Sequence, residues 1–335
     1  YRTFSVVPKA TLTFDDKVLV FSGAKPRTVN LTVRNAVPAK GTVKLALPEG
    51  WKSTPAEALF DFATADGEQR VSFLVTPNSV SGTVSAVATF ADGGTSTVSE
   101  TTIDYPHIPI QTLFPPAEAR LVRLAAETPK KRVGYVMGSG DEIPAALRQL
   151  GMEVTLLTDD DLAGSDLSRY DAIVAGIRAY NTRPRLKQLQ PRLLSYVEKG
   201  GTLVVQYNTS GGDLVTKDLG PYPFELSRER VTVEEAPVTF LAKASPLLTT
   251  PNAISDKDFE GWVQERGLYF AGKWDPKYTA VLAASDPGEP AREGGLLYAK
   301  HGKGAFVFTG YSFFRQLPAG VPGAYRLFVN LVCAK

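Results

Sequence analysis

The sequence predicts two domains of different fold class, a β-sandwich followed by a doubly wound α/β domain with a parallel sheet. Its length of 335 residues exceeds what one hydrophobic core usually organises. Near residue 131 the pattern changes from apolar–polar alternation to continuous apolar strands separated by helical spacing. Four prolines fall between residues 106 and 116. We therefore assign residues 1–108 to the sandwich, 109–130 to a Pro-rich linker and 131–335 to the α/β domain.

Short alternating strands fill the first of these regions. The string TVNLTVRN, at residues 28–35, places Val29, Leu31 and Val33 on one face of a half-buried strand. Similar strings follow at close spacing, separated by Pro, Gly, Asn and Asp, which is typical of an antiparallel sandwich. Trp51, in LPEGW, follows a turn, where it either caps the core or stacks on a sugar ring.

Strands and helices alternate after Lys131. A buried strand, RVGYVMG, precedes the helical pattern DEIPAALRQLG, with Asp141 expected as its N-terminal cap and Gly151 at its C-terminal end. The order strand, helix, strand, strand, helix, strand predicts a parallel sheet covered on both faces. A hairpin turning at Gly302 and Gly304 and a closing helix at residues 323–332 complete this domain.

Charge and cysteine content exclude several classes of function. The chain has 37 Lys and Arg against 35 Asp and Glu, so we expect no nucleic-acid partner. No apolar run approaches the roughly 18 residues of a membrane helix. A single cysteine, Cys333, excludes an internal disulfide and a thiolate metal cluster. Because the chain begins with Tyr1, we expect a removed targeting segment or another domain before it.

Polar and aromatic residues gather where the predicted parallel strands end. Ligands of open α/β sheets bind beyond the carboxyl ends of the strands, where the strand order reverses. Tyr311, Phe314 and Gln316, after a later strand, are expected at the same crevice. Guanidinium, amide and aromatic groups are suited to a neutral sugar or a peptide. The candidate ligand-binding residues are Ser139, Asp141, Arg178, Tyr180, Asn181, Gln206, Tyr207, Asn208, Glu265 and Arg315.

Other interpretations of these residues remain open at this point. In the first alternative, these residues form a buried polar network, for example with Arg178 paired to Glu265. Alternatively, the crevice is that of a hydrolase with Ser139 or a carboxylate as catalyst. However, Gly138 and Gly140 flank that serine as G-S-G rather than G-x-S-x-G, and they fit a tight turn better. The third alternative is a purely architectural spacer or assembly module.

A second group of acidic residues lies in SDKDFEGWVQER. Asp256, Asp258, Glu260 and Glu265 would serve as acid and base or as calcium ligands, but unpaired loop carboxylates are usually solvated. His301, in KHGKG, is expected to be an exposed turn residue. The sequence therefore predicts no catalytic residue, no metal site and no cofactor.

Several long strings resemble known families. GIRAYNT, GGTLVVQYNT, WVQERGLYF and FFRQLPAGVPGAYRLFVNL resemble the C-terminal region of large exported bacterial proteins of the PIG-L (LmbE-like) deacetylase family. The half from Lys131 onward looks like a class I glutamine amidotransferase-like domain, close to ThuA-like proteins and of flavodoxin-like topology. The first half, through LPEGW, resembles the Ig-like domain associated with NPCBM carbohydrate-binding modules.

The resemblance implies an exported protein whose chemistry lies elsewhere. In an amidotransferase, the strand matching TLVVQYN ends in a nucleophilic cysteine, but here Gln206 or Tyr207 stands at that position. The zinc motif of the PIG-L domain, His-Pro-Asp-Asp, has no counterpart in this sequence. We therefore expect a pseudoenzyme-like accessory region that binds a sugar or cell-envelope glycan. Its zinc-dependent deacetylase partner domain is expected upstream of Tyr1.

Overall fold

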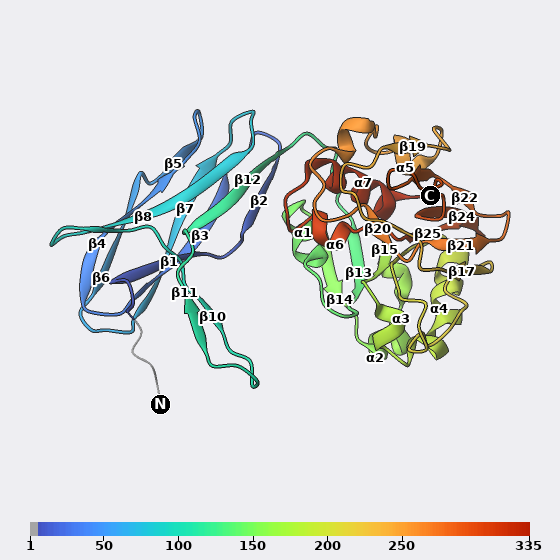
Figure 1. The fold of residues 1–335 in the computed structure, drawn as a ribbon, viewed down its shortest axis with the longest axis horizontal. Coiled ribbons are helices and arrows are strands. Elements are labelled where there is room, and N and C mark those ends of the chain that lie inside the picture. Colours follow the sequence, from blue (N-terminus) through green and yellow to red (C-terminus); the bar gives the residue numbers. More distant parts are fainter. Residues whose placement is uncertain (1–5) are drawn as a thin grey trace. The chain divides into compact units, whose positions relative to one another are not determined.

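The computed structural model describes residues 6–335, which form a β-rich unit followed by an α/β unit (Figure 1). The two units divide between Ala125 and Ala126, inside the segment that the sequence predicted as a linker. Within residues 6–335, no helix has the length and apolarity needed to cross a membrane.

Two sheets pack face to face in the first unit. Val29 and Leu31 of β3 (Arg27–Asn35) share a buried core with Phe73 of β7 (Glu68–Thr76) and with Val84 and Ala86 on the other sheet. Trp51 belongs to this core: its ring packs edge-on against Phe21, so the interpretation as a core residue is correct. The first sheet has the order β1 (Ala10–Phe14), β3 (Arg27–Asn35), β7 (Glu68–Thr76) and β5 (Lys52–Thr54).

The second sheet contains a strand that the sequence pattern does not predict. Residues 118–124, expected in a linker, form β12, which pairs antiparallel with β8 and parallel with β2. The sheets are therefore not purely antiparallel. The second sheet has the order β2 (Val18–Ser22), β12 (Glu118–Leu124), β8 (Gly82–Phe90), β4 (Ala39–Ala46) and β6 (Glu57–Phe62), with β9 (Thr95–Ser96) beside β8.

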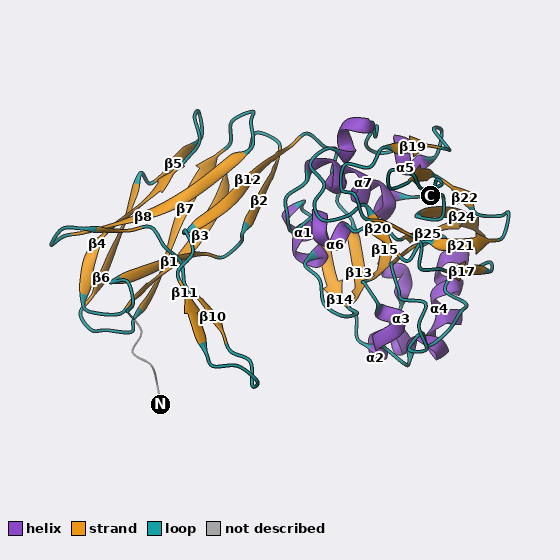
Figure 2. Ribbon diagram, in the orientation of Figure 1, coloured by secondary structure: helices purple, strands orange, loops and turns teal. Residues whose placement is uncertain are grey.

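The prolines that suggested a linker lie where strands tolerate them. Pro106 and Pro109 fall between β10 (Thr101–Ile103) and β11 (Gln111–Leu113), which form a separate hairpin (Figure 2). Pro115 and Pro116 precede β12, and proline is tolerated just before a strand because no ladder donor is lost. The linker prediction for residues 109–130 is therefore wrong over β11 and β12.

A seven-stranded mixed sheet is the centre of the second unit. Its first strand begins at Arg132, as expected, and five neighbouring strands run parallel. The hairpin turn lies at Gly302, as predicted. The order is β14 (Glu153–Leu156), β13 (Arg132–Val136), β15 (Ala172–Ala175), β16 (Thr202–Gln206), β25 (Gly304–Thr309), β24 (Leu296–His301) and β22 (Thr279–Ala280).

Helices pack on this sheet through their apolar sides. Leu189 and Leu193 of α4 share a core with Leu203 and Val205 of β16, and α7 packs against β15 and β16. The α-helices are α1 (Ile143–Gln149), α2 (Asp159–Gly164), α3 (Ala179–Thr182), α4 (Leu186–Glu198), α5 (Pro246–Thr249), α6 (Phe313–Gln316) and α7 (Pro322–Cys333), with 3-10 turns at Leu167–Arg169 and Asp256–Phe259.

Three two-stranded antiparallel sheets lie in the segment between β16 and β24. Such short pairs give no strong periodic signal, so the sequence does not predict them. They are β17 (Phe224–Leu226) with β21 (Ala271–Trp274), β18 (Arg230–Val231) with β20 (Gly267–Leu268), and β19 (Val238–Phe240) with β23 (Leu282–Ala284).

Candidate functional site at the carboxyl edge of the parallel sheet

The carboxyl ends of β13, β15, β16 and β25 lie along one edge of the sheet, since these strands are parallel neighbours. All the predicted ligand-binding residues lie at the end of one of these strands or follow it, except Glu265, which is hydrogen-bonded to Arg315 after β25. The strand order reverses between β13 and β15, which is the place where open α/β sheets usually bind ligands.

The loops at this reversal contact each other directly. The backbone N–H of Ser139 donates to the carbonyl of Ile177 at 2.9 Å. A Cβ at Gly138 would lie 2.1 Å from that same carbonyl oxygen, so only glycine allows this approach. Gly140 has a φ of +98°. The glycines beside Ser139 therefore serve the tight turn, and the serine itself is exposed.

A chain of hydrogen bonds links the ends of β13 and β16. The Tyr135 hydroxyl donates to both carboxylate oxygens of Asp141 at 2.7 Å and accepts from Gln206 Nε2 at 2.9 Å. Gln206 is 1% exposed, and its Oε1 has no partner within residues 6–335. Burial raises the pKa of Asp141, an effect that the hydrogen bond from Tyr135 opposes. The amide at the expected nucleophile position is therefore fixed inside the protein.

Asn208 extends this arrangement to the loop after β15. Its Oδ1 accepts from the backbone N–H of Tyr180 at 2.9 Å, and its Nδ2 donates to the carbonyl of Gln206 at 2.9 Å. Asn181 and Thr209 exchange two further hydrogen bonds across the same loops. Tyr180 and Asn208 are completely buried. We call Tyr135, Asp141, Tyr180, Gln206 and Asn208 the inner network.

Three aromatic rings lie beyond the inner network, toward β25. The ring of Tyr207 stacks on that of Tyr269 at a centroid distance of 6.0 Å and meets that of Phe314 at 5.2 Å. Tyr207 is 8% exposed, whereas Tyr269 and Phe314 are only half-buried. The Tyr207 hydroxyl makes no hydrogen bond within the part of the chain that the structure describes. We call these three residues the aromatic cluster.

Charged side chains surround Tyr207. Burial raises the pKa of its hydroxyl, and the guanidinium groups of Arg178 and Arg315 oppose this effect. Arg178 forms an ion pair with Asp213 at 3.0 Å, and Arg315 forms one with Glu265 at 2.6 Å. The suggested pairing of Arg178 with Glu265 is therefore wrong, because each residue has another partner.

Several residues near the aromatic cluster have a strained backbone. Arg178 has a φ of 55°, Gln264 of 67° and Tyr269 of 53°, and Asp66 is the only other described non-glycine residue with positive φ. The left-handed region is unfavourable for long side chains, and such residues cluster at functional sites. The loops that carry the aromatic cluster are therefore held in conformations that local preference disfavours.

The remaining candidates differ in burial and in their partners. Asp258 is buried, pairs with Arg326 at 2.7 Å and accepts from Ser255 at the start of a 3-10 turn. Tyr311 and Gln316, expected at the crevice, are also buried. Asp256 and Glu260 are exposed, and the described residues hold no group of three His, Cys, Asp or Glu side chains arranged to bind a metal ion.

Two residues of this edge could not be expected from the sequence. Tyr135 lies within an apolar strand, so it reads as a core residue, and its contact with Asp141 depends on the turn between them. Tyr269 lies far along the chain in a segment without clear periodicity. Its positive φ and its stacking on Tyr207 become visible only in three dimensions.

Comparisons with known proteins give only distant likenesses. No family model and no curated protein matches the chain. An exo-β-1,4-mannosidase from Opitutaceae bacterium strain TAV5 shares 13% identity over 61% of this chain and 36% of its own, with a TM-score of 0.37. An MSP family member of C. elegans shares 12% identity over 35% of this chain and 98% of its own (TM-score 0.20). A family 123 glycoside hydrolase from Clostridium perfringens shares 9% identity over 66% of this chain and 42% of its own, with a TM-score of 0.19. These TM-scores are too low to carry an argument about function.

Proposed function

We propose that this chain is a non-catalytic accessory region that binds a neutral sugar or cell-envelope glycan. The aromatic cluster carries the proposal. Tyr269 and Phe314 are half-buried rings at the edge where α/β sheets bind ligands, and aromatic faces stack on the apolar faces of sugar rings. Beside them, the charges of Arg178 and Arg315 act on the Tyr207 hydroxyl, which has no hydrogen-bond partner among residues 6–335 and is the group proposed to bind a sugar hydroxyl.

Removing one ring tests this proposal. Tyr269→Ala should abolish the glycan binding that the unaltered chain shows on a glycan array. Tyr222→Ala, which removes another half-buried tyrosine near the amino end of β25, is the matched control and should bind normally. If the unaltered chain binds no glycan, the architectural alternative replaces this proposal.

The proposed context is a larger exported protein of the PIG-L deacetylase type, in which an Ig-like domain precedes a degenerate amidotransferase-like domain. The strand order β14-β13-β15-β16-β25 supports this, since it is the 2-1-3-4-5 order of flavodoxin-like folds. Either Gln206 or Tyr207 stands at the nucleophile position; neither is an activatable nucleophile and both are buried, which supports a degenerate domain. An open reading frame without a zinc-binding His-Pro-Asp-Asp motif upstream of Tyr1 would contradict the proposed context.

A hydrolase is the second candidate, and Asp141 is the observation that favours it. This carboxyl group is half-buried, its pKa is raised by burial, and Tyr135 donates to it. A carboxyl group of raised pKa is suited to general acid or base catalysis. Hydrolysis of glycosides or esters that is lost in Asp141→Asn and retained in Ser139→Ala would favour this candidate over the binding function.

A further inference from the structure

A pocket of about 510 Å³ lies in the second unit, between residues 234–238, which lead into β19, and residues 256–261 at the second 3-10 turn. Ligand pockets have volumes of roughly 300–1,000 Å³. The lining of this pocket carries four carboxylates and one guanidinium group. The pocket is therefore large enough for a small ligand, and its charges decide which kind of ligand it suits.

Arg266 is the innermost charged group of this pocket, because it is only 4% exposed. Its Nε donates to the carbonyl of Ala236 at 2.9 Å and its Nη1 to the carbonyl of Phe259 at 2.5 Å, so it ties the two walls together. Its Nη2 makes no hydrogen bond, and the guanidinium group forms no ion pair, within residues 6–335. Since buried charges in proteins are usually paired, this side chain retains a donor for a ligand.

Carboxylates lie nearer the mouth of the pocket. Glu235, Asp256 and Glu260 are exposed, and none of them forms an ion pair or side-chain hydrogen bond within residues 6–335. Glu234 is half-buried and accepts from the backbone N–H of Gln264 at 2.5 Å. The described residues hold no group of three His, Cys, Asp or Glu side chains arranged to bind a metal ion. The carboxylates therefore suit an organic cation rather than a metal ion.

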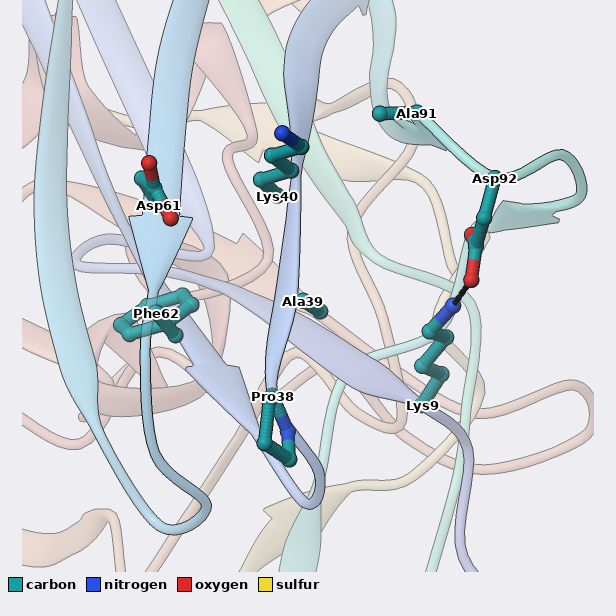
Figure 3. A pocket seen from close by; sticks show the side chains of 8 residues that line it. All are labelled: Lys9, Pro38, Ala39, Lys40, Asp61, Phe62, Ala91 and Asp92. Carbon is teal, nitrogen blue, oxygen red and sulfur yellow. Dashed lines mark hydrogen bonds and ion pairs between the residues drawn. The ribbon is translucent and has the colours of Figure 1, made fainter.

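The pocket of the sandwich shown in Figure 3 lacks a buried charge of this kind. The ladder between β4 and β6 places Lys40 and Asp61 on its solvent side, and Ala39 and Phe62 on its core side. All the charged side chains of that pocket are exposed or half-buried. A buried guanidinium group without an ion pair distinguishes the pocket at Arg266 from it.

The ligand must match a negative mouth and a positive interior. An anion such as phosphate would be repelled by the carboxylates, and a simple diamine would bring a cation against Arg266. An amino acid carries both charges: its carboxylate accepts from Nη2 of Arg266, and its ammonium groups bind the carboxylates at the mouth. Four carboxylates against one guanidinium group favour a basic amino acid such as lysine, whose methylenes pack on Pro237. We propose that this pocket binds a basic amino acid, either free or at the C-terminus of a peptide.

Binding of L-lysine to the full chain, measured by isothermal titration calorimetry, tests this site. Changing the ligand spares Arg266, whose removal would also release the two walls. Cadaverine lacks the carboxylate of lysine, and norleucine lacks its ε-ammonium group. Each should bind roughly tenfold or more weakly than lysine, since each loses a charge-assisted hydrogen bond. Cadaverine that binds as tightly as lysine would reveal only a negative surface and would overturn the proposal.

Substitutions at the mouth of the pocket give the second test. A double variant, Asp256→Asn with Glu260→Gln, removes two exposed carboxylates, and lysine should bind it about threefold to tenfold more weakly. Glu153→Gln, at the exposed start of β14, is the matched control and should bind lysine normally. Equal affinity for lysine in these two variants would overturn the proposal.

Tripeptides separate the two sources of the ligand. If the pocket takes the end of a peptide, Ala-Ala-Lys with a free C-terminus should bind, whereas its C-terminal amide should not, because the amide has no carboxylate for the guanidinium group. Binding of free lysine without binding of the tripeptide would assign the pocket to the free amino acid. Absence of binding by both would overturn the proposal.

Discussion

The inner network and the aromatic cluster occupy the same sheet edge but differ in how deeply their side chains are buried. In the inner network, Tyr180 and Asn208 are completely buried and hydrogen-bonded to neighbouring loops. In the aromatic cluster, Tyr269 and Phe314 remain half-buried, and the Tyr207 hydroxyl has no partner among the described residues. The strand-order reversal, where ligands usually bind, is thus closed by the protein itself, and the groups left for a ligand lie beside β25.

The largest difference between the two regions should appear in stability. Tyr180→Ala removes a fully buried ring and its hydroxyl bond to Gln190, and we expect a loss of about 3–5 kcal/mol in the free energy of unfolding. Phe314→Ala, in the aromatic cluster, should cost clearly less because the ring is half-buried. Urea unfolding measures both values. Equal losses would mean that the two regions are not distinct.

Asn208 tests the hydrogen bonds of the inner network without a large change in packing. Asn208→Ala leaves the buried N–H of Tyr180 and the carbonyl of Gln206 without their partners, and we expect a loss of about 1–3 kcal/mol. Asn181→Ala, at a half-buried position in the adjacent loop, is the comparison variant. If both variants unfold at the same urea concentration as the unaltered chain, the network contributes no stability.

The next prediction concerns the aromatic cluster and tests the backbone strain at Tyr269. A φ of 53° strains a residue that has a Cβ but does not strain glycine. Tyr269→Gly should therefore be more stable than Tyr269→Ala, by about 1 kcal/mol. Thermal unfolding compares the two variants directly. A glycine variant less stable than the alanine variant would show that the loop is not strained.

The smallest expected effect is a change in pH dependence at Asp141. Because burial raises its pKa above the ordinary 3.8, the folded state holds this proton more tightly than the unfolded state. Its contribution to stability is thus fully present below the unfolded pKa and is lost as pH rises through the folded pKa. Asp141→Asn should remove this decline, which melting temperatures measured from acidic to neutral pH would reveal.

An exposed carboxylate gives the control for that measurement. Asp218→Asn, at an exposed position, should leave the shape of the pH profile unchanged. If Asp141→Asn also leaves it unchanged, the carboxyl group does not experience the burial that the structure indicates. The comparison between a closed inner network and an open aromatic cluster would then lose its electrostatic basis.

The sequence predicts the strands of this edge well, because their apolar runs are long and uninterrupted. The parallel strand at Arg132 and the hairpin turn at Gly302 follow from such local patterns. The burial of the candidate residues does not follow from local patterns, since the burial of Gln206 and Asn208 depends on loops that come from distant parts of the chain. Tyr269 was not predicted either, because its segment has no clear periodicity and its contact with Tyr207 joins distant parts of the chain.

The error at β12 has a different origin. The prolines at residues 106–116 led to the prediction of a linker, although the apolar residues Leu121 and Val122 indicate a strand. Prolines beside a strand leave its hydrogen-bond ladder intact. A single sequence shows whether a segment can form a strand, but the partner of that strand is a property of the whole sheet. No local pattern indicates that β12 lies between β2 and β8.

The position of β12 sets a time order for folding during synthesis. Arg123 hydrogen-bonds to the carbonyl of Phe21, 102 residues earlier in the chain. Until β12 emerges from the ribosome, β2 and β8 present unpaired edges that invite pairing with other chains. Since β13 begins soon after, at Arg132, the first unit closes only when the second has begun to appear. A nascent chain halted before residue 118 would therefore lack the strand that joins β2 to the sheet of β8, β4 and β6.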